Sequence, residues 1–504
     1  MFTSKDHLLI AAIAVYLLLT IALGLWAARK VKNSADYVVA GNKLPLYMVI
    51  ATVFATWFGS ETVLGTSATF INEGLGGIVA DPFGAALCLV LVGLFFAVPL
   101  YRLKLLTIGD YYRVRYGRDI EVMTSIVIML SYLGWVAAQL AALGLVFNVI
   151  THGVIDITTG IFIGALIVLI YTVFGGMWSI ALTDLMQMSF IAVGLIYITW
   201  LVTGRIDGGA ATVIAHASEA NKLNLLPETN LAGWLTFFGA LITLGFGSIP
   251  QQDIYQRVMS ANSARNARLG SIIGGLLYLA FAMLPLYLAY SAFIMEPAMV
   301  NELLAEGGDS QMVLPTLILQ HTPLLAQILF FGALISAIMS TASATLLAPA
   351  TMFSENIMGK FFRRQTEPKK LLYIRLSVLA FTACVLVYSL QSEQSIFQMV
   401  EDAYKVVLVG AFVPLAAGLY WQRASLNGAR LAILFGVSCW LLFELLDAGN
   451  YWTLIGFPDA AGVCPPQLAG FVMSAVGMFI GSMIWPNTQP LPQPPQDDSL
   501  VTGK

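Results

Sequence analysis

The sequence predicts an all-α integral membrane protein with about 13 transmembrane helices, and three observations support that prediction. Of the 504 residues, 58% are hydrophobic and only 11% are charged, too few to cover a water-soluble surface of this size. Apolar runs long enough to cross a bilayer recur along the chain. Lys and Arg collect in every second connection between those runs.

Each predicted span is an apolar run of roughly 20 residues or more, the length that crosses the hydrocarbon core as a helix. The first run is too long for a signal-peptide core and no small-residue cleavage site follows it, so we expect it to persist as a helix. In chain order the runs lie near 8–28, 45–72, 82–101, 120–150, 155–174, 178–203, 232–256, 269–295, 322–357, 371–391, 398–421, 430–447 and 468–485.

Positive charge alternates between the connections. Because cytoplasmic connections retain Lys and Arg, the alternation predicts an odd number of spans in the plasma (inner) membrane, with the N-terminus outside and the C-terminus cytoplasmic. The stretch "NEGLGGIVADP" has no basic residue, and the loop with Arg205 and Lys222 is a mild exception. The basic connections cover residues 29–43, 102–118, 257–268, 360–370 and 423–430.

One polytopic transmembrane domain, residues 1–486, is expected to account for nearly the whole chain. Residues 487–504 are polar and rich in Pro, which predicts a disordered cytoplasmic tail. No connection is long enough for a soluble catalytic domain, so an enzyme is not expected. The net charge of −3 argues against nucleic acid as a partner, and the scattered Cys and His residues suggest no metal framework. The oligomeric state stays open.

Glycines interrupt two of the predicted spans at membrane depth. The second span contains "ATWFGSETVLG" and the seventh contains "LITLGFGSIPQQDIYQR", so a Phe-Gly-Ser triplet recurs five spans later. A lone glycine more often marks a kink or a close helix contact. Paired breaks in corresponding spans instead indicate an inverted-repeat transporter with its site at the midplane, here with repeats at about 45–205 and 230–421.

Hydroxyl groups crowd the ninth span, in "GALISAIMSTASATLL". Ser336, Ser340 and Ser343 share one helical face, and Thr341 lies beside them. Such residues also promote tight helix packing. The functional alternative is an oxygen cage for a hard monovalent cation, completed by carbonyls freed at a break. Asp184, in the sixth span, is either a span-end residue or an intramembrane carboxylate with a function.

Four motifs, in this order along the chain, resemble those of the sodium/solute symporter family: "ATWFGSETVLGTSA", "YTVFGGMWSIALTDLMQ", "SIPQQDIYQRVMSA" and "ISAIMSTASATLL". The closest pattern is that of the high-affinity choline-type carriers. The resemblance implies a LeuT-like inverted repeat of five plus five helices, with one extra helix before it and two after it. It also implies alternating access coupled to sodium, and it leaves a role for chloride open.

The resemblance also assigns ion ligands. Some relatives bind a second sodium through the aspartate of the "TD" element and two hydroxyls. Asp184 and Ser343 match that pattern, whereas Ala344 stands where the second hydroxyl would be, so the stoichiometry is left open. The main sodium site would combine three backbone carbonyls with two hydroxyls, from Ala55, Phe58, Ala337, Ser340 and Thr341.

The expected solute site departs from that of the choline-type carriers, which enclose a quaternary ammonium in aromatic rings. Trp57 and Trp135 match two members of such a cage, although membrane packing would also explain them. Thr62 and Gln251 stand where those carriers have aromatic residues, and Gln252 adjoins them. These side chains offer hydrogen bonds instead, which suits an amino acid or another hydroxylated or amidic solute.

Glu61, beside the first break, is the most informative departure. It would pair with a cationic or zwitterionic amine, carry a proton, or only shape the field of a water-filled vestibule. We therefore predict sodium-coupled symport of a small organic solute, namely an amino acid, an amine or a choline-like compound. The alternatives are a proline, other amino-acid or carboxylate symporter of the same family, a solute-sensing membrane protein, and a twelve-span facilitator.

Overall fold

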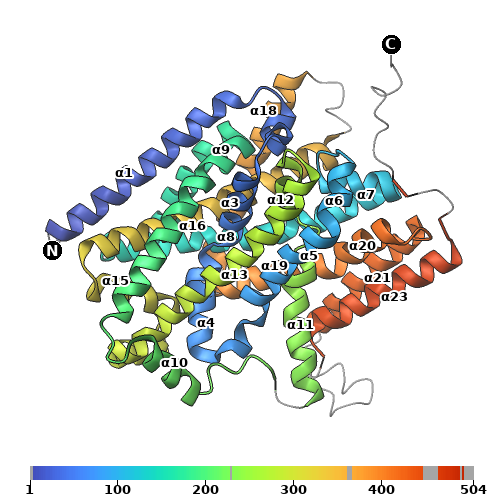
Figure 1. Cartoon of the computed structure of the whole chain (residues 1–504). Coiled ribbons are helices and arrows are strands. Elements are labelled where there is room, and N and C mark those ends of the chain that lie inside the picture. The colour runs from blue at the N-terminus through green and yellow to red at the C-terminus, as the bar shows by residue number, and fades with distance from the viewer. Residues whose placement is uncertain (1–3, 228–229, 360–365, 446–463, 488–490, 493–504) are drawn as a thin grey trace.

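The chain is all-helical throughout the part that the computed structural model describes (Figure 1). That part is the whole chain except residues 1–3, 228–229, 360–365, 446–463, 488–490 and 493–504. The expected disordered tail, 487–504, lies almost wholly outside the described residues. Backbone polar groups cannot be left unpaired in hydrocarbon, and helices satisfy them within each segment.

Ten helical segments are long and apolar enough to cross a membrane, by length and composition. They follow the predicted spans closely, which confirms the class of fold. The segments are Ser4–Lys30 (α1 and η1), Leu75–Arg102 (η4 to α6), Arg118–Ile150 (α8), Thr172–Thr203 (within α9), Ala264–Met295 (α13), Leu324–Ile357 (α16 and η8), Glu367–Gln391 (α18), Ile396–Tyr420 (α19 to α20), Leu426–Leu445 (α21) and Pro466–Ile484 (α23).

Two further spans are broken, at the positions where the sequence predicted breaks. The first joins α3 (Leu46–Trp57) to Glu61–Glu73, which comprises η3 (Glu61–Gly65) and α4 (Thr66–Glu73), with a bend of 54°. The second joins α11 (Leu231–Gly247) to α12 (Gln252–Ser260), with a bend of 48°. Counting each bent pair as one span gives up to 12 spans among the described residues.

A thirteenth span stays a prediction. The expected spans 155–174 and 178–203 fall in one long helix, α9 (Ile157–Thr203), whose backbone leaves helical geometry at Gly176. Gly176 has φ +50, and a Cβ there would lie 2.4 Å from the carbonyl oxygen of Tyr37, so the kink requires glycine. The part of α9 before the kink is apolar over Ile157–Ile170.

Hydrogen bonds bring the described parts of the five basic connections, or the helix ends beside them, together at one end of the bundle. The connections poor in basic residues meet elsewhere, where Lys222 bonds Asn72 and Ile396 bonds Gln311. The alternation in the sequence therefore corresponds to two separate ends of the helices. The bonds that join basic connections, or the helix ends beside them, are Ser34 to Glu367, Leu44 to Ser260, Tyr101 to Ala261, Arg115 to Ala424 and Arg118 to Ile357.

Helix α16 (Leu324–Met352) lies at the centre of the molecule. Every residue from Phe330 to Met352 is buried, as expected for a helix enclosed by others. In contrast, α1 (Ser4–Ala27) and α18 expose large apolar side chains such as Leu18 and Val387, which suits a lipid-facing position. The hydroxyl-rich segment is thus in the interior, where a site can be shielded from lipid.

Backbone pairing joins the two broken spans at the basic end. The segment before α3 and the segment after α12 form a short parallel bridge between Leu44 and Ala261. Leu44 N–H donates to the Ser260 carbonyl at 2.9 Å, and Asn262 N–H donates to the Leu44 carbonyl at 2.9 Å. The start of one broken span is therefore fixed against the end of the other.

Candidate functional site

The first break lies between Trp57, which ends α3, and Glu61, which begins η3. Ser60 N–H, freed from the helical ladder, donates to Gln139 Oε1 of α8 at 3.0 Å. A Cβ at Gly59 would lie 2.4 Å from Glu61 Oε2 and 2.8 Å from Thr341 Oγ1, so glycine permits a close approach here. The break is therefore packed directly against α8 and α16.

Oxygen atoms from three helices converge beside this break. Thr341 Oγ1 of α16 donates to the Thr56 carbonyl of α3 at 2.8 Å. Ser340 Oγ donates to Asp184 Oδ1 of α9 at 2.6 Å, and Thr52 Oγ1 of α3 donates to the other carboxylate oxygen. Carbonyl, hydroxyl and carboxylate oxygens are hard donors, so this set fits a hard monovalent cation.

The expected ligands of the main sodium site are all buried in this region. Ser340 and Thr341 reach α9 and α3, as described above, so the structure brings the hydroxyls to the broken helix. Phe58 sits at the break itself, with φ −88 and ψ 76, and its N–H still donates to the Phe54 carbonyl at 3.0 Å. Ala55 lies one turn before Phe58, and Ala337 one turn before Thr341.

The two residues expected for a second sodium site are not hydrogen-bonded to each other. Ser343 Oγ donates to the Ser340 carbonyl of its own helix at 3.0 Å. Asp184 instead bonds the Ser340 hydroxyl. The carboxylate therefore lies beside a ligand expected for the main site, which the sequence motif did not indicate.

Arg257 supplies a positive charge that sequence reasoning placed wrongly. It was expected in a basic connection, but it lies in α12 and is only 1% exposed. Its Nε donates to Thr56 Oγ1 at 2.8 Å, and its Nη1 donates to the Asp253 carbonyl at 2.8 Å. Its charge acts on Asp184 and on the Asp253 carboxylate. An intramembrane ionisable residue is a functional candidate, but the predicted span ended one residue too early, at 256.

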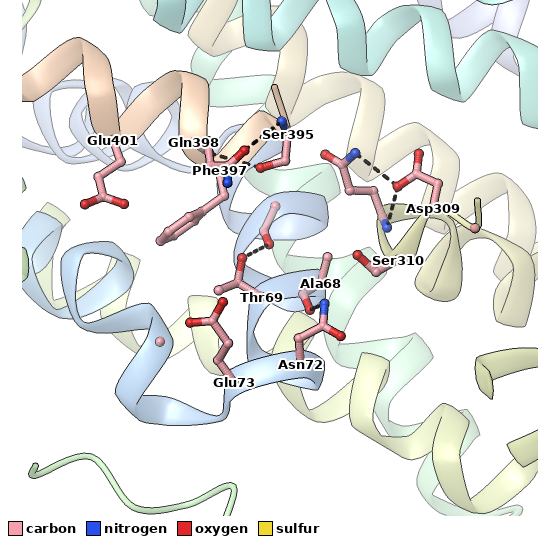
Figure 2. Close-up of a pocket in the computed structure, with 14 residues that line it drawn as sticks. Ala68, Thr69, Asn72, Glu73, Asp309, Ser310, Ser395, Phe397, Gln398 and Glu401 are labelled. Atoms are coloured by element: carbon pink, nitrogen blue, oxygen red, sulfur yellow. Dashed lines mark hydrogen bonds between the residues drawn. The ribbon is translucent and has the colours of Figure 1, made fainter. Parts of the chain in front are cut away.

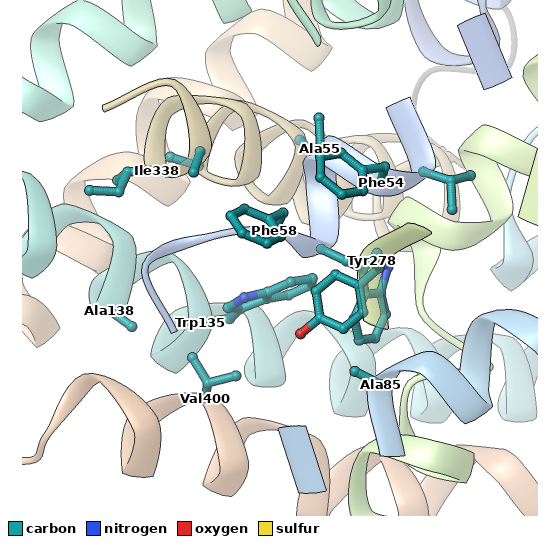
Figure 3. Packing of buried hydrophobic residues seen from close by; sticks show 14 of the residues in the cluster. Phe54, Ala55, Phe58, Ala85, Trp135, Ala138, Tyr278, Ile338 and Val400 are labelled. Carbon is teal, nitrogen blue, oxygen red and sulfur yellow. The ribbon is translucent and has the colours of Figure 1, made fainter. Parts of the chain in front are cut away.

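Four aromatic rings pack together next to the break. The centroids of Trp57 and Trp135 lie 5.7 Å apart, as expected for two members of one cage. Tyr404 of α19 (Ile396–Val407) stacks on Trp57 at 6.0 Å and lies 5.3 Å from Trp135. Tyr278 of α13 meets Trp57 edge-on at 6.5 Å. Figure 3 shows Trp135 and Tyr278 near Phe58. The two tyrosines supply rings that the sequence did not predict.

Two buried carboxylates border these rings. Glu61 accepts hydrogen bonds from Gln139 Nε2 at 2.6 Å and from Trp135 Nε1 at 3.2 Å. Asp81 of η5 (Val79–Gly84) accepts one from Thr66 Oγ1 at 3.0 Å and another from the Tyr278 hydroxyl. Asp81 was expected in a connection, because the apolar run that follows it was taken to begin at 82.

Thr62, which follows Glu61 in the chain, links the first break to Asp81 through Tyr278. Its hydroxyl lies 3.1 Å from the Tyr278 hydroxyl, which in turn bonds Asp81. Of the expected solute-site residues, Trp57, Glu61, Thr62 and Trp135 therefore lie in one continuous cluster.

Gln251 and Gln252, the other two, lie at the second break and bond neighbouring protein groups. Gln251 Nε2 donates to Ser131 Oγ of α8 at 2.9 Å. Gln252 Oε1 accepts from Ile108 N–H, at the start of α7 (Ile108–Tyr116), at 2.8 Å. Both side chains anchor the second break to other helices.

A cavity of about 370 Å³ lies at the end of the bundle away from the basic connections (Figure 2). Its lining includes three acids, Glu73, Asp309 and Glu401, and no Lys, Arg or His. Gly65 and Phe397 also line it and touch each other: a Cβ at Gly65 would lie 3.0 Å from the Phe397 backbone nitrogen. Because Gly65 is one turn beyond Glu61 in the same span, the cavity approaches the cluster of carboxylates and rings.

Comparisons with known proteins identify the family and the fold of the chain. A model of the sodium:solute symporter family matches residues 37–436. The high-affinity choline transporter 1 of Caenorhabditis elegans is 28% identical over 458 residues, which cover 86% of this chain and 77% of that protein. The osmoregulated proline transporter of Bacillus subtilis is 24% identical over 499 residues, 94% of each chain.

One solved structure has nearly the same fold over its whole length. It is a Na+-coupled sialic acid symporter in a substrate-bound, outward-open state. The TM-score is 0.79 at 19% identity, with 97% of this chain and 99% of that chain covered. At this identity the likeness concerns the fold.

Proposed function

Because the chain belongs to the sodium:solute symporter family, we propose that it carries a small organic solute together with Na+ by alternating access. The relatives named above are transporters, and their substrates differ. The solute is an amino acid, an amine or a choline-like compound. A proline, other amino-acid or carboxylate symporter is the alternative within the family, and a solute sensor is a weaker one.

One observation supports sodium coupling above the others. The hydroxyls of Ser340 and Thr341 contact the first broken helix and the Asp184 carboxylate. Backbone carbonyls at a broken helix and hydroxyl oxygens are the ligands that transporters of this architecture present to Na+. We therefore assign the main site to Ser340 and Thr341 with the carbonyls of Ala55, Phe58 and Ala337.

A second Na+ would use Asp184, with Ser343 as the other expected ligand. The bond from Ser340 to Asp184 supports a carboxylate that serves both positions, since Ser340 belongs to the main site. The proposed stoichiometry is one Na+ or two.

The solute is proposed to contact Trp57, Glu61, Thr62 and Trp135, which lie in one cluster at the break. Gln251 and Gln252 would contribute only after giving up their present protein partners. The basic end of the bundle is proposed to face the cytoplasm of a plasma (inner) membrane, which places the N-terminus outside.

Uptake by reconstituted protein tests this proposal. Proteoliposomes are offered labelled choline, proline and an amine under an inward Na+ gradient, and again with K+ in its place. We expect accumulation only with Na+. Thr341→Ala should weaken apparent Na+ affinity by roughly tenfold, because it removes a ligand from a desolvated cation.

Thr345→Ala is the matched control, since Thr345 lies one turn further along the same helix and bonds the Thr341 carbonyl. It should leave Na+ affinity within about twofold of wild type. Equal uptake in K+ would contradict sodium coupling. A larger loss of solute affinity than of Na+ affinity in Thr341→Ala would place the hydroxyl in the solute site.

A further inference from the structure

We propose that the solute is an organic cation without a carboxylate of its own, and that Glu61 and Asp81 together supply its countercharge. The inference rests on the proposed function, because it takes the cluster at the first break to be the solute site. It narrows the substrate from several chemical classes to one.

Both carboxylates are held as hydrogen-bond acceptors in the interior. Each is only 3% exposed. Gln139 and Trp135 donate to Glu61, and Thr66 and Tyr278 donate to Asp81. Hydrogen bonds donated to a carboxylate favour its ionised form, and a positive ligand beside it would favour that form further.

No positive group of the described chain pairs with either carboxylate. Neither Glu61 nor Asp81 takes part in any ion pair among the described residues. Arg257 is engaged with Thr56 and the Asp253 backbone. Buried charges are paired in stable proteins because desolvation is costly. The missing positive charge is therefore assigned to the ligand.

The surrounding rings suit a positive nitrogen. Trp57, Trp135, Tyr278 and Tyr404 lie with neighbouring centroids 5.3 to 6.5 Å apart, the spacing of aromatic rings in contact. A ring face that the solute reaches in this cluster would attract a cation. Three buried polar atoms beside them have no partner in the described structure: Trp57 Nε1, Tyr404 OH and Ser60 Oγ. Buried polar groups are rarely left unpaired, so these atoms point to a polar ligand.

The acidic cavity points to the same class of solute. Glu73, Asp309 and Glu401 line it without a basic residue, and it approaches Glu61 from the end away from the basic connections. A cleft lined by one sign of charge concentrates the opposite ion. A solute carboxylate would be repelled here and again at Glu61 and Asp81, so the site disfavours both acids and amino acids.

Matched trios of compounds test the proposal with the full-length purified protein. The first trio is choline, its neutral isostere 3,3-dimethylbutan-1-ol, and glycine betaine, in which a carboxylate replaces the alcohol group of choline. The second is pentylamine, pentanol and 5-aminopentanoate. Thermal unfolding is measured with each compound, with and without Na+, since a ligand that binds the native state raises its stability.

We expect at least one cation to stabilise the protein, while its neutral and carboxylated counterparts do not. Glu61→Gln and Asp81→Asn should each weaken that cation's apparent affinity by roughly tenfold or more, because each removes half of the countercharge. Glu306→Gln is the control: it removes an exposed acid close to Asp309 in sequence that does not line the cavity.

Stabilisation by a carboxylated or neutral compound at least as strong as by its cation would overturn the inference. So would stabilisation by none of the cations, or unchanged cation affinity in both variants. The comparison with and without Na+ tests the proposed function separately. A cation that binds equally with and without Na+, and is taken up without it, would defeat the proposed function and leave this inference standing.

Discussion

The two broken spans bend by similar angles, 54° and 48°, but their polar groups have different partners. At the first break, Glu61 lies against aromatic rings, and Thr341 and Ser340 bring hydroxyls from α16. At the second break, Gln251 and Gln252 are bonded to other helices of the protein. A bend alone therefore does not define a binding site; the groups that its freed backbone and side chains contact decide the role.

The second break also supports the first through Arg257. Arg257 lies in α12, and its side chain donates to Thr56 on α3, immediately before the first break. Its charge faces Asp184, which bonds the Ser340 hydroxyl. Under the proposed function, the first break binds the ligands and the second break positions the residues that hold them.

The largest effect is expected when the shared carboxylate is removed. Asp184→Ala leaves the Ser340 and Thr52 hydroxyls without their acceptor and removes the negative charge that interacts with Arg257. Breaking a buried charged network of this kind costs about 3–5 kcal/mol. Na+-driven uptake should fall by roughly 100-fold or more. Thermal unfolding with increasing Na+ would show a weaker stabilisation by the ion than in wild type.

Asp184→Asn separates charge from shape in the same position. It keeps the side-chain volume and one of the two acceptor oxygens, so we expect a smaller loss of stability but a similar loss of Na+ response. Na+-driven uptake close to wild type in Asp184→Asn would show that the carboxylate serves packing alone.

The second largest effect compares glycines at the two breaks. In Gly59→Ala the new methyl meets the ends of the Glu61 and Thr341 side chains, so the fold adapts but the site is displaced. In Gly247→Ala it meets the Tyr404 carbonyl at 2.8 Å, which pushes two helices apart and costs about 1–3 kcal/mol.

We therefore measure uptake and unfolding temperature for both variants. Uptake should change more in Gly59→Ala, and unfolding temperature should change more in Gly247→Ala. Gly59→Ala is expected to lose roughly 10- to 100-fold in uptake with a small change in unfolding temperature. Gly247→Ala should lose stability first. The same pattern in both variants would remove the distinction between the breaks.

The smallest effect is expected for Gln251→Ala. It removes one buried hydrogen bond to Ser131, worth about 1 kcal/mol, and the ring cluster at the first break stays intact. The solute KM should rise by no more than about fivefold. A rise well beyond that, with unchanged stability, would mean that the second break also binds the solute.

The class of fold and the two breaks could be predicted because their signals are local. Apolar runs, alternating basic connections and the repeated Phe-Gly-Ser triplets each lie within a short window of sequence. The hydroxyl-rich segment that contains Ser340 and Thr341 is likewise a local signal. The partners of these hydroxyls, Thr56 and Asp184, lie on helices distant in sequence. They could be identified only from the packing of the helices.

Other parts of the site were missed for identifiable reasons. Arg257 and Asp81 lie just outside the predicted spans. An error of one or two residues in the span boundaries therefore placed them in connections instead of in the membrane. Tyr278 and Tyr404 lie on helices whose apolar residues face both lipid and protein, so periodicity gives little sign of which face turns inward. Only the packing of α13 and α19 against α3 reveals them.

The Leu44–Ala261 bridge has a mechanical consequence. It clamps the entrance of one broken span to the exit of the other, backbone to backbone, at the basic end. When the bundle opens at this end, the two broken spans would then move together as one unit. The surrounding helices would slide past that unit. A disulfide formed by Leu44→Cys with Ala261→Cys should therefore leave the transport rate unchanged. A crosslink from α3 to α16 should instead stop transport.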